Sequence, residues 1–192
     1  MFALARARNL FCMEAMRTRF QLAHVRMREL LAEGVIGEPR MLRACLGLAM
    51  PLDVLALWMN VHAGGCALAL GVHPTALGVN VFSKGGVEQP SLVVAVGDLS
   101  IAEKVDVQLQ CMLQYGPGRM AVLSNSMQAN LDCEAHISGT KGWMKIFRPE
   151  FHCAHKIIFK RDTDPPCSPS PSQRLPISRS MTLSSWCTSA LK

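Results

Sequence analysis

The sequence has few aromatic residues and few charges. Aromatic side chains make up 6% of the 192 residues, and tyrosine occurs once. Charged residues make up 18% and hydrophobic residues 49%, a balance that excludes a disordered chain and suffices for one packed domain. With so few aromatics, we expect a core of Leu, Val, Ala and Met.

Several motifs that carry chemistry are missing. The sequence contains no Gly-x-Gly-x-x-Gly fingerprint, no P-loop, no Gly-x-Ser-x-Gly elbow and no His-Glu-x-x-His pair. These absences exclude, from this chain, the glycine-rich turns that bind dinucleotides and phosphates, the hydrolase nucleophile and the zincin metal pair. The cofactor-binding residues therefore stay unknown at this stage.

The eight cysteines are irregularly spaced and form no Cys-x-x-Cys pair. Because no secretory signal is in view, we expect free thiols in a reducing, cytoplasmic setting. One cluster has the residue types that zinc prefers: Cys133, His136, His152, Cys153 and His155. A hairpin turning near Thr140 would pair His136 with about Met144 rather than with His152, so we predict no metal site.

The net charge of +6 comes largely from arginines in the first 43 residues. No stacking aromatics or known module accompany them, so we expect a solvated helix face and no nucleic-acid partner. The first 13 residues carry two arginines, Arg6 and Arg8, and no acid, which loosely resembles a mitochondrial presequence. Because Glu14 interrupts this pattern and hydroxyl residues are absent before Thr18, an ordinary amphipathic helix is the preferred interpretation.

Residues 54–83 lack Asp, Glu, Lys and Arg, over more than the ~20 residues that a membrane span needs. The run nevertheless contains His62, His73, Pro74 and four glycines. We therefore predict a buried helix with its approach loop, and no membrane partner.

Hydrophobic periodicity predicts an α+β fold. Helices are expected over residues 20–33 and 64–82, and Pro74 predicts a kink or a late start in the second. Residues 1–16 are expected to form a helix, or a helix that continues into a strand at 10–13. Strands are expected at 40–48, 92–96, 105–115, 121–137 and 143–147, with 105–115 and 121–137 forming a hairpin. From about residue 162, prolines and serines predict a disordered tail, 161–192.

Five collinear segments resemble one family. Residues 14–20 (EAMRTRF) resemble a Glu-Ala-φ-Trp-Thr-Arg-Phe signature, and residues 63–73 (AGGCALALGVH) resemble a Gly-Gly-Ala-Leu-Leu-Asp-φ-Gly-φ-Tyr box. Support comes from residues 36–40, 112–115 and 137–142. The chain is thereby similar, over about residues 1–160, to the glucose–fructose oxidoreductase/inositol dehydrogenase-like family, on its dimeric dihydrodiol dehydrogenase branch.

The resemblance implies two domains, of which this chain contains the C-terminal one. Residues 1–20 would be the end of a nucleotide-binding Rossmann domain that is otherwise missing, together with its Glu-Lys-Pro motif. Residues 21–160 would form the substrate and dimerisation domain, with an open-faced, mostly antiparallel sheet and helices packed on one face.

The resemblance also assigns a site. His73 stands at the position of the family's catalytic tyrosine, Ala69 at that of its aspartate, and Arg17 at that of the signature's aromatic residue. It implies an NADP-dependent oxidoreductase of trans-dihydrodiols or aldoses such as D-xylose, here truncated and impaired. The alternatives are a non-catalytic interaction module that forms a homodimer through its exposed sheet, and an unstable fragment of the full enzyme.

Overall fold

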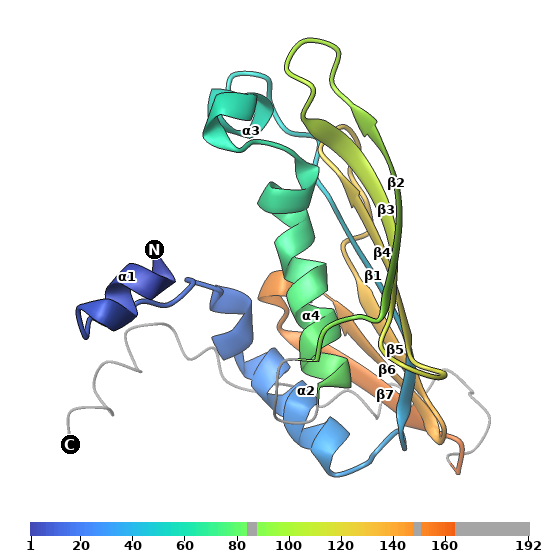
Figure 1. The fold of residues 1–192 in the computed structure, drawn as a ribbon. Helices are drawn as coiled ribbons and strands as arrows, with labels where there is room; N and C mark the ends of the chain where they lie inside the picture. The colour runs from blue at the N-terminus through green and yellow to red at the C-terminus, as the bar shows by residue number, and fades with distance from the viewer. Residues whose placement is uncertain (84–87, 148–150, 164–192) are drawn as a thin grey trace.

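The protein is a single sheet with helices on one face. The computed structural model describes residues 1–83, 88–147 and 151–163, so the predicted tail lies outside the described residues from 164 onward. Two longer helices cover one side of the sheet, while the opposite side faces outward (Figure 1). This arrangement confirms the predicted α+β class with helices packed on one face.

The helices and strands have the following bounds. The α-helices are α1 (Phe2–Ala7), α2 (Leu22–Ala32), α3 (Leu55–Trp58) and α4 (Val72–Phe82), and α4 directly continues a π-helical turn, η3 (Ala67–Gly71). Short 3-10 turns are η1 (Arg17–Phe20), η2 (Asn60–His62) and η4 (Phe151–Cys153). The strands are β1 (Pro39–Gly47), β2 (Leu92–Leu99), β3 (Asp106–Gln114), β4 (Met120–Ser126), β5 (Ala135–Gly139), β6 (Gly142–Phe147) and β7 (Lys156–Arg161).

The seven strands lie in the order β2-β3-β4-β1-β5-β6-β7. The pair β1 and β4 is parallel, and the other five pairs are antiparallel. The expected open, mostly antiparallel sheet is therefore confirmed. Strand β1 separates two meanders that are each continuous in sequence, β2-β3-β4 and β5-β6-β7.

The predicted single strand over residues 121–137 is wrong. The chain leaves β4 at Ser126, crosses the end of β1, and returns as β5 on the other side of β1. Hydrogen bonds mark the crossing: the Leu48 amide donates to the Ser126 carbonyl, and the Leu131 amide to the Gly47 carbonyl. Met127 and Cys133 are buried at the two ends of the crossing, whereas Ala129 between them is exposed. The alternation of apolar and polar residues in the sequence therefore continues where the strand does not.

The other expected elements have mixed outcomes. The β3–β4 and β5–β6 hairpins and the helix before Phe82 are confirmed. Strand β2 runs three residues beyond the predicted end at 96, and β7 was not predicted. In the first segment only Phe2–Ala7 is helical, and the alternative strand at 10–13 is absent from these described residues.

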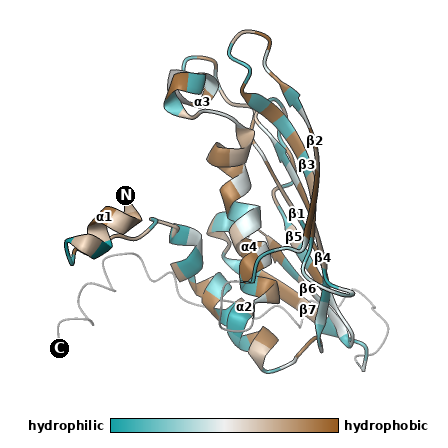
Figure 2. Ribbon diagram, viewed as in Figure 1, coloured by the Kyte–Doolittle hydropathy of each residue, from teal (hydrophilic) through white to brown (hydrophobic). Residues whose placement is uncertain are grey.

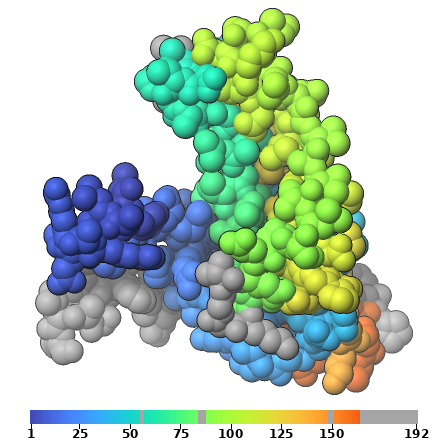
Figure 3. All heavy atoms as spheres, viewed as in Figure 1, coloured from blue at the N-terminus to red at the C-terminus, as the bar shows by residue number. Residues whose placement is uncertain are grey.

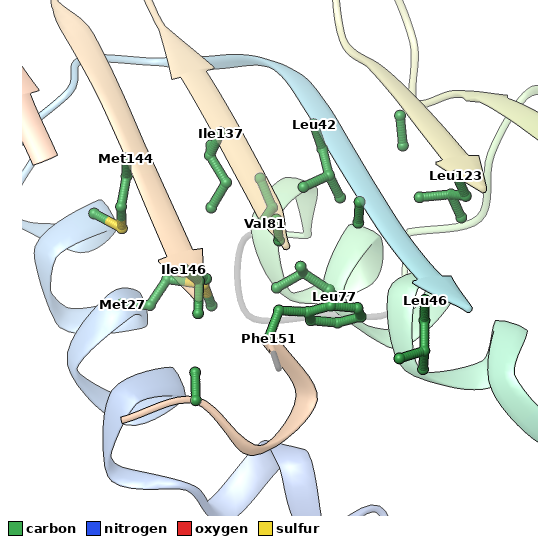
Figure 4. Packing of buried hydrophobic residues seen from close by; sticks show 14 of the residues in the cluster. Met27, Leu42, Leu46, Leu77, Val81, Leu123, Ile137, Met144, Ile146 and Phe151 are labelled. Carbon is green, nitrogen blue, oxygen red and sulfur yellow. The ribbon is translucent and has the colours of Figure 1, made fainter. Parts of the chain in front are cut away.

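The core lies between the helices and the inner face of the sheet (Figure 4). Leu42, Ile137 and Met144 stand in one cross-strand row and are fully buried. Leu77 and Val81 of α4 cover this row. The other fully buried side chains of the core include Met27, Leu46, Leu123, Ile146 and Phe151. Aliphatic and methionine side chains thus supply most of the core, as the composition predicted.

Helix α1 stands apart from this body. None of its residues is buried, and Figures 1 and 3 show it projecting away from the sheet and α4. The helical run Asn60–Phe82 is long and apolar enough to cross a membrane by length and composition, and 50% of its apolar stretch is buried inside the molecule. The core helix of a soluble protein can have the same length and composition.

Candidate functional site around His73

The helix that carries His73 is anchored at its start by Asp106 of β3. The Asp106 carboxylate accepts a hydrogen bond from the Ala67 amide at 2.6 Å, which satisfies a donor that the first helical turn leaves free. Gly65 has a φ of +123°, and a Cβ there would collide with this carboxylate. The double glycine of the family box therefore allows the chain to approach β3 closely before the helix begins.

Pro74 lies one residue after His73 and has no amide proton to donate. The π-helical turn Ala67–Gly71 ends three residues before it. The wider π-helical turn accommodates the proline ring while the helix continues. The irregularity predicted at Pro74 is therefore a π-helical turn just before it. Ala69 and His73 are four residues apart, so they lie on neighbouring turns of the same helical face.

Thr18 joins His73 to a second histidine. The Thr18 hydroxyl donates to the carbonyl of His152 at 2.9 Å, and its oxygen lies 3.2 Å from Nδ1 of His73. Because the single hydroxyl proton goes to that carbonyl, the oxygen accepts the Nδ1 proton of His73. The neutral His73 ring therefore has its basic lone pair on Nε2.

Two further histidines lie near the hydrogen bonds of Thr18. The rings of His73 and His152 have centroids 4.8 Å apart. His24 of α2 is fully buried, and its Nε2 donates to the carbonyl of Phe151 at 2.7 Å. Three segments far apart in sequence, near residues 18–24, 73 and 152, thus meet at one place between α2 and the start of α4.

The surroundings favour neutral imidazoles. Burial is the largest cause that lowers the pKa of His73, to about 4, and nearby His152, Arg17 and His24 lower it further. Burial also lowers the pKa of His24, against the opposing effect of its bond to Phe151. At neutral pH, His73 is therefore an uncharged base beside an arginine.

The structure brings two of the residues that the sequence singled out near one another, and it adds residues that were not predicted. Arg17 and His73, which the family pattern singled out, lie close enough to interact electrostatically. Thr18 and His24 were not predicted as site residues, and His152 was considered only as a zinc ligand. Thr18 belongs to the signature at residues 14–20, but nothing in the sequence shows that its hydroxyl reaches His73.

The zinc alternative finds no support in the geometry. Cys133 is buried and bonds to carbonyls of Gly47 and Leu131, whereas His136 lies on the outer face of the sheet, stacked on Trp143. His152 lies beside His73 instead. Within residues 1–83, 88–147 and 151–163, no three His, Cys, Asp or Glu side chains form a group that could hold a metal ion.

The described residues do not fit a dinucleotide cofactor. A dinucleotide is normally held where a parallel strand turns through glycines into a helix. The one parallel pair in the described sheet, β1 and β4, is connected through α4 and the antiparallel hairpin β2–β3, and no glycine-rich turn joins β1 to a helix. We therefore assign no residue here to cofactor binding.

Comparisons with known proteins match the same part of the chain. The family described as GFO/IDH/MocA C-terminal domain matches residues 24–145. The trans-1,2-dihydrobenzene-1,2-diol dehydrogenase of Mus musculus is 35% identical over 146 residues, which cover 76% of this chain and 42% of that protein. Its counterpart in Bos taurus is 31% identical over 185 residues, covering 96% and 53%.

Solved structures share the fold. An aldose-aldose oxidoreductase from Caulobacter crescentus superposes with a TM-score of 0.72 at 18% identity, covering 90% of this chain and 52% of that one. A 3-ketoreductase from Actinomadura kijaniata, in complex with NADP, gives 0.70 at 21% identity, covering 85% and 50%. The chain spans about half the length of the relatives it matches, and it belongs to the GFO/IDH/MocA family, whose C-terminal domain it contains.

Proposed function

We propose that this chain forms the substrate side of an NADP-linked oxidoreductase acting on a hydroxyl group of a diol or an aldose such as D-xylose. Relatives named as dihydrodiol dehydrogenases support the diol, and a structural neighbour named as an aldose-aldose oxidoreductase supports the sugar. The NADP complex of another neighbour supports the cofactor. The observation that carries the proposal is the neutral His73 ring with its basic nitrogen fixed at Nε2.

His73 would move the proton of the reaction. Oxidation of an alcohol to a carbonyl releases the hydroxyl proton, and a base within hydrogen-bond reach accelerates that transfer. Thr18 holds the ring through Nδ1, so Nε2 is the atom that accepts the proton. Arg17, which stands where the family signature has an aromatic residue, would lie beside the substrate rather than stack on it.

Substrate binding gives a test that needs no cofactor. Saturation-transfer NMR on the purified chain with a trans-dihydrodiol, and separately with D-xylose, should show binding that His73→Ala weakens. His62→Ala, on the exposed turn Asn60–His62, is the matched control and should bind like the wild type. If neither the trans-dihydrodiol nor D-xylose binds, the substrate-side role is contradicted.

Cofactor binding is tested separately. The purified chain is mixed with NADPH, and nicotinamide fluorescence is followed up to millimolar cofactor. Enhanced fluorescence would show that the isolated chain binds NADPH, which the enzyme interpretation requires. No enhancement would end the enzyme interpretation for the isolated chain and leave the substrate-side role to the NMR test.

A second candidate is homodimerisation through the outer face of the sheet. Apolar side chains on this face come from four strands: Val94 of β2 lies opposite Met112 of β3, and Met120 of β4 lies opposite Met41 of β1. These four side chains are between 38% and 45% exposed. Met120→Lys should convert a dimer of this kind into a monomer in light scattering, and a monomeric wild type would exclude it.

We also propose a reducing, cytoplasmic setting, because the thiols of Cys12, Cys45, Cys66 and Cys111 form no disulfide with one another. The remaining alternative is an unstable fragment. A cooperative thermal unfolding transition of the purified chain would exclude that alternative.

A further inference from the structure

Strand β2 is an edge strand that none of the described residues covers. It lies at one end of the sheet order, and all eight of its residues are exposed, on both faces. Five of the eight are Val or Leu, and the exposure of Leu92, Val93, Val94, Val96 and Leu99 is 44–73%. Figure 2 shows the hydrophobic colour along this strand. An exposed apolar edge is a template for pairing with another strand.

The direction of the free backbone groups follows from the ladder. The Met127 amide donates to the Val107 carbonyl, so odd-numbered residues of β3 direct their backbone groups toward β4. Even-numbered residues of β3 then face β2, where Met112 lies opposite Val94. The backbone groups of Val93, Ala95 and Gly97 therefore point away from the sheet.

The opposite edge of the sheet is protected. Strand β7 has the sequence KIIFKR, with cationic side chains at Lys156, Lys160 and Arg161. Charged side chains and prolines are the usual devices that prevent edge pairing. Strand β2 contains no proline, lysine or arginine and one charge, Asp98 near its end. The two edges of one sheet thus differ in the feature that decides whether a strand joins another.

We propose that β2 pairs edge to edge with β2 of a second copy of this chain, antiparallel and centred on Ala95. In this register Ala95 lies opposite Ala95 of the second copy, and Val93 lies opposite Gly97. All the outward backbone groups of the strand are then paired, because each opposed pair exchanges two hydrogen bonds.

The side chains fit this register. On the outer face Val94 would lie opposite Val96 of the second copy, which makes two contacts between β-branched residues. The two Asp98 side chains would lie at opposite ends of the contact, each opposite Leu92, so they do not repel one another. Since each copy uses its one unprotected edge, the assembly closes as a dimer rather than growing into a fibre.

Proline at Ala95 tests the backbone pairing. Ala95→Pro removes an amide that points outward, so the β2–β3 ladder stays intact and light scattering should fall from twice the 21.0 kDa chain mass to that mass. Val94→Pro is the matched control, because it removes an amide that faces β3 and should lower the unfolding midpoint. A wild type that is monomeric at its highest soluble concentration overturns the proposal.

Charges at the twofold position test the register. Ala95→Lys and Ala95→Glu each place two like charges opposite one another, so each variant should be monomeric, with a dissociation constant raised at least about tenfold. An equal mixture of the two variants should dimerise again, because Lys then lies opposite Glu. The side chain of residue 95 is on the helix side of the sheet, so these variants do not touch the outer-face surface that contains Met120.

The outcomes separate the two modes of association. Monomeric single variants with a restored mixed dimer support the edge contact centred on Ala95. Single variants that remain dimeric place the contact elsewhere, and a mixture that stays monomeric contradicts the proposed register. Either result overturns the proposal.

Discussion

A partly buried histidine couples the site to pH. The pKa of His73 is about 4 in the folded chain, against 6.5 for an unperturbed side chain. Between these values the unfolded chain binds a proton that the folded chain does not, so the free energy of unfolding decreases as the pH falls from about 6.5 toward 4. Below about pH 4 this contribution no longer changes with pH.

We predict that moving from pH 7 to pH 4.5 costs the folded state about 2 kcal/mol through His73, after allowance for solvent screening of a partly exposed ring. Urea unfolding of His73→Gln at the two pH values should show a loss smaller by about that amount. His62→Gln, on an exposed turn, should keep the wild-type dependence. Equal pH dependence of the wild type and His73→Gln would contradict the burial of this ring.

Thr18 gives a second test of the same site. Thr18→Val keeps the shape but removes the hydroxyl that bonds to His73 and to the His152 carbonyl, so unfolding should cost about 1–2 kcal/mol less. Nitrogen NMR should also show mixed tautomers at His73. Thr18→Ser keeps the hydroxyl and should retain a single Nδ1-protonated tautomer; mixed tautomers in Thr18→Ser would argue against the hydroxyl as the determinant.

The position of His73 could be predicted from the sequence, whereas its partners could not. Four-residue spacing on a helix places Ala69 and His73 together whatever the rest of the chain does. Thr18 and His152 are 134 residues apart, and they meet because α2 and the turn Phe151–Cys153 pack against each other. Contacts between segments so far apart depend on the assembled core, which no local pattern contains.

At the scale of elements, the start of the helix containing η3 and α4 depends on one carboxylate. Asp106→Ala removes the acceptor for the Ala67 amide and should lower the free energy of unfolding by about 1 kcal/mol, as loss of a helix cap does. Asp106→Asn retains an acceptor oxygen and should lose less. Chemical denaturation of both variants measures the difference, and an equal loss would show that charge rather than the bond is required.

Strand prediction succeeded where alternation ended at a turn and failed where it did not. The glycines and proline of residues 116–118 end the alternating run of β3, so β3 was predicted within a residue of its bounds. No such signal separates β4 from β5. Cys133 adopts a φ of +51° within the crossing, a conformation that a cysteine rarely shows and that its residue type does not announce.

At the scale of the whole molecule, the body of the fold begins near Arg17. Helix α1 and the residues that follow it bury no side chain before Thr18. Deletion of residues 1–16 should therefore change the free energy of unfolding by less than about 0.5 kcal/mol. Trypsin should cleave first at the exposed Arg6 and Arg8, leaving the sheet intact. A large loss of stability on deletion would show that this segment packs on the body.

The strand order of the sheet also determines the order in which its strands can pair during synthesis. Strand β1 is made before both of its neighbours, because β4 and β5 come from sequence more than 70 residues later. Each meander needs only contacts that are short in sequence, whereas β1 must wait for both and join them. We expect the nascent chain to hold one side of β1 unpaired until residue 139 has left the exit tunnel, although β4 can already pair with its other side. This central strand therefore stays incompletely paired for longer than the strands of either meander, and it is the one most exposed to chaperones.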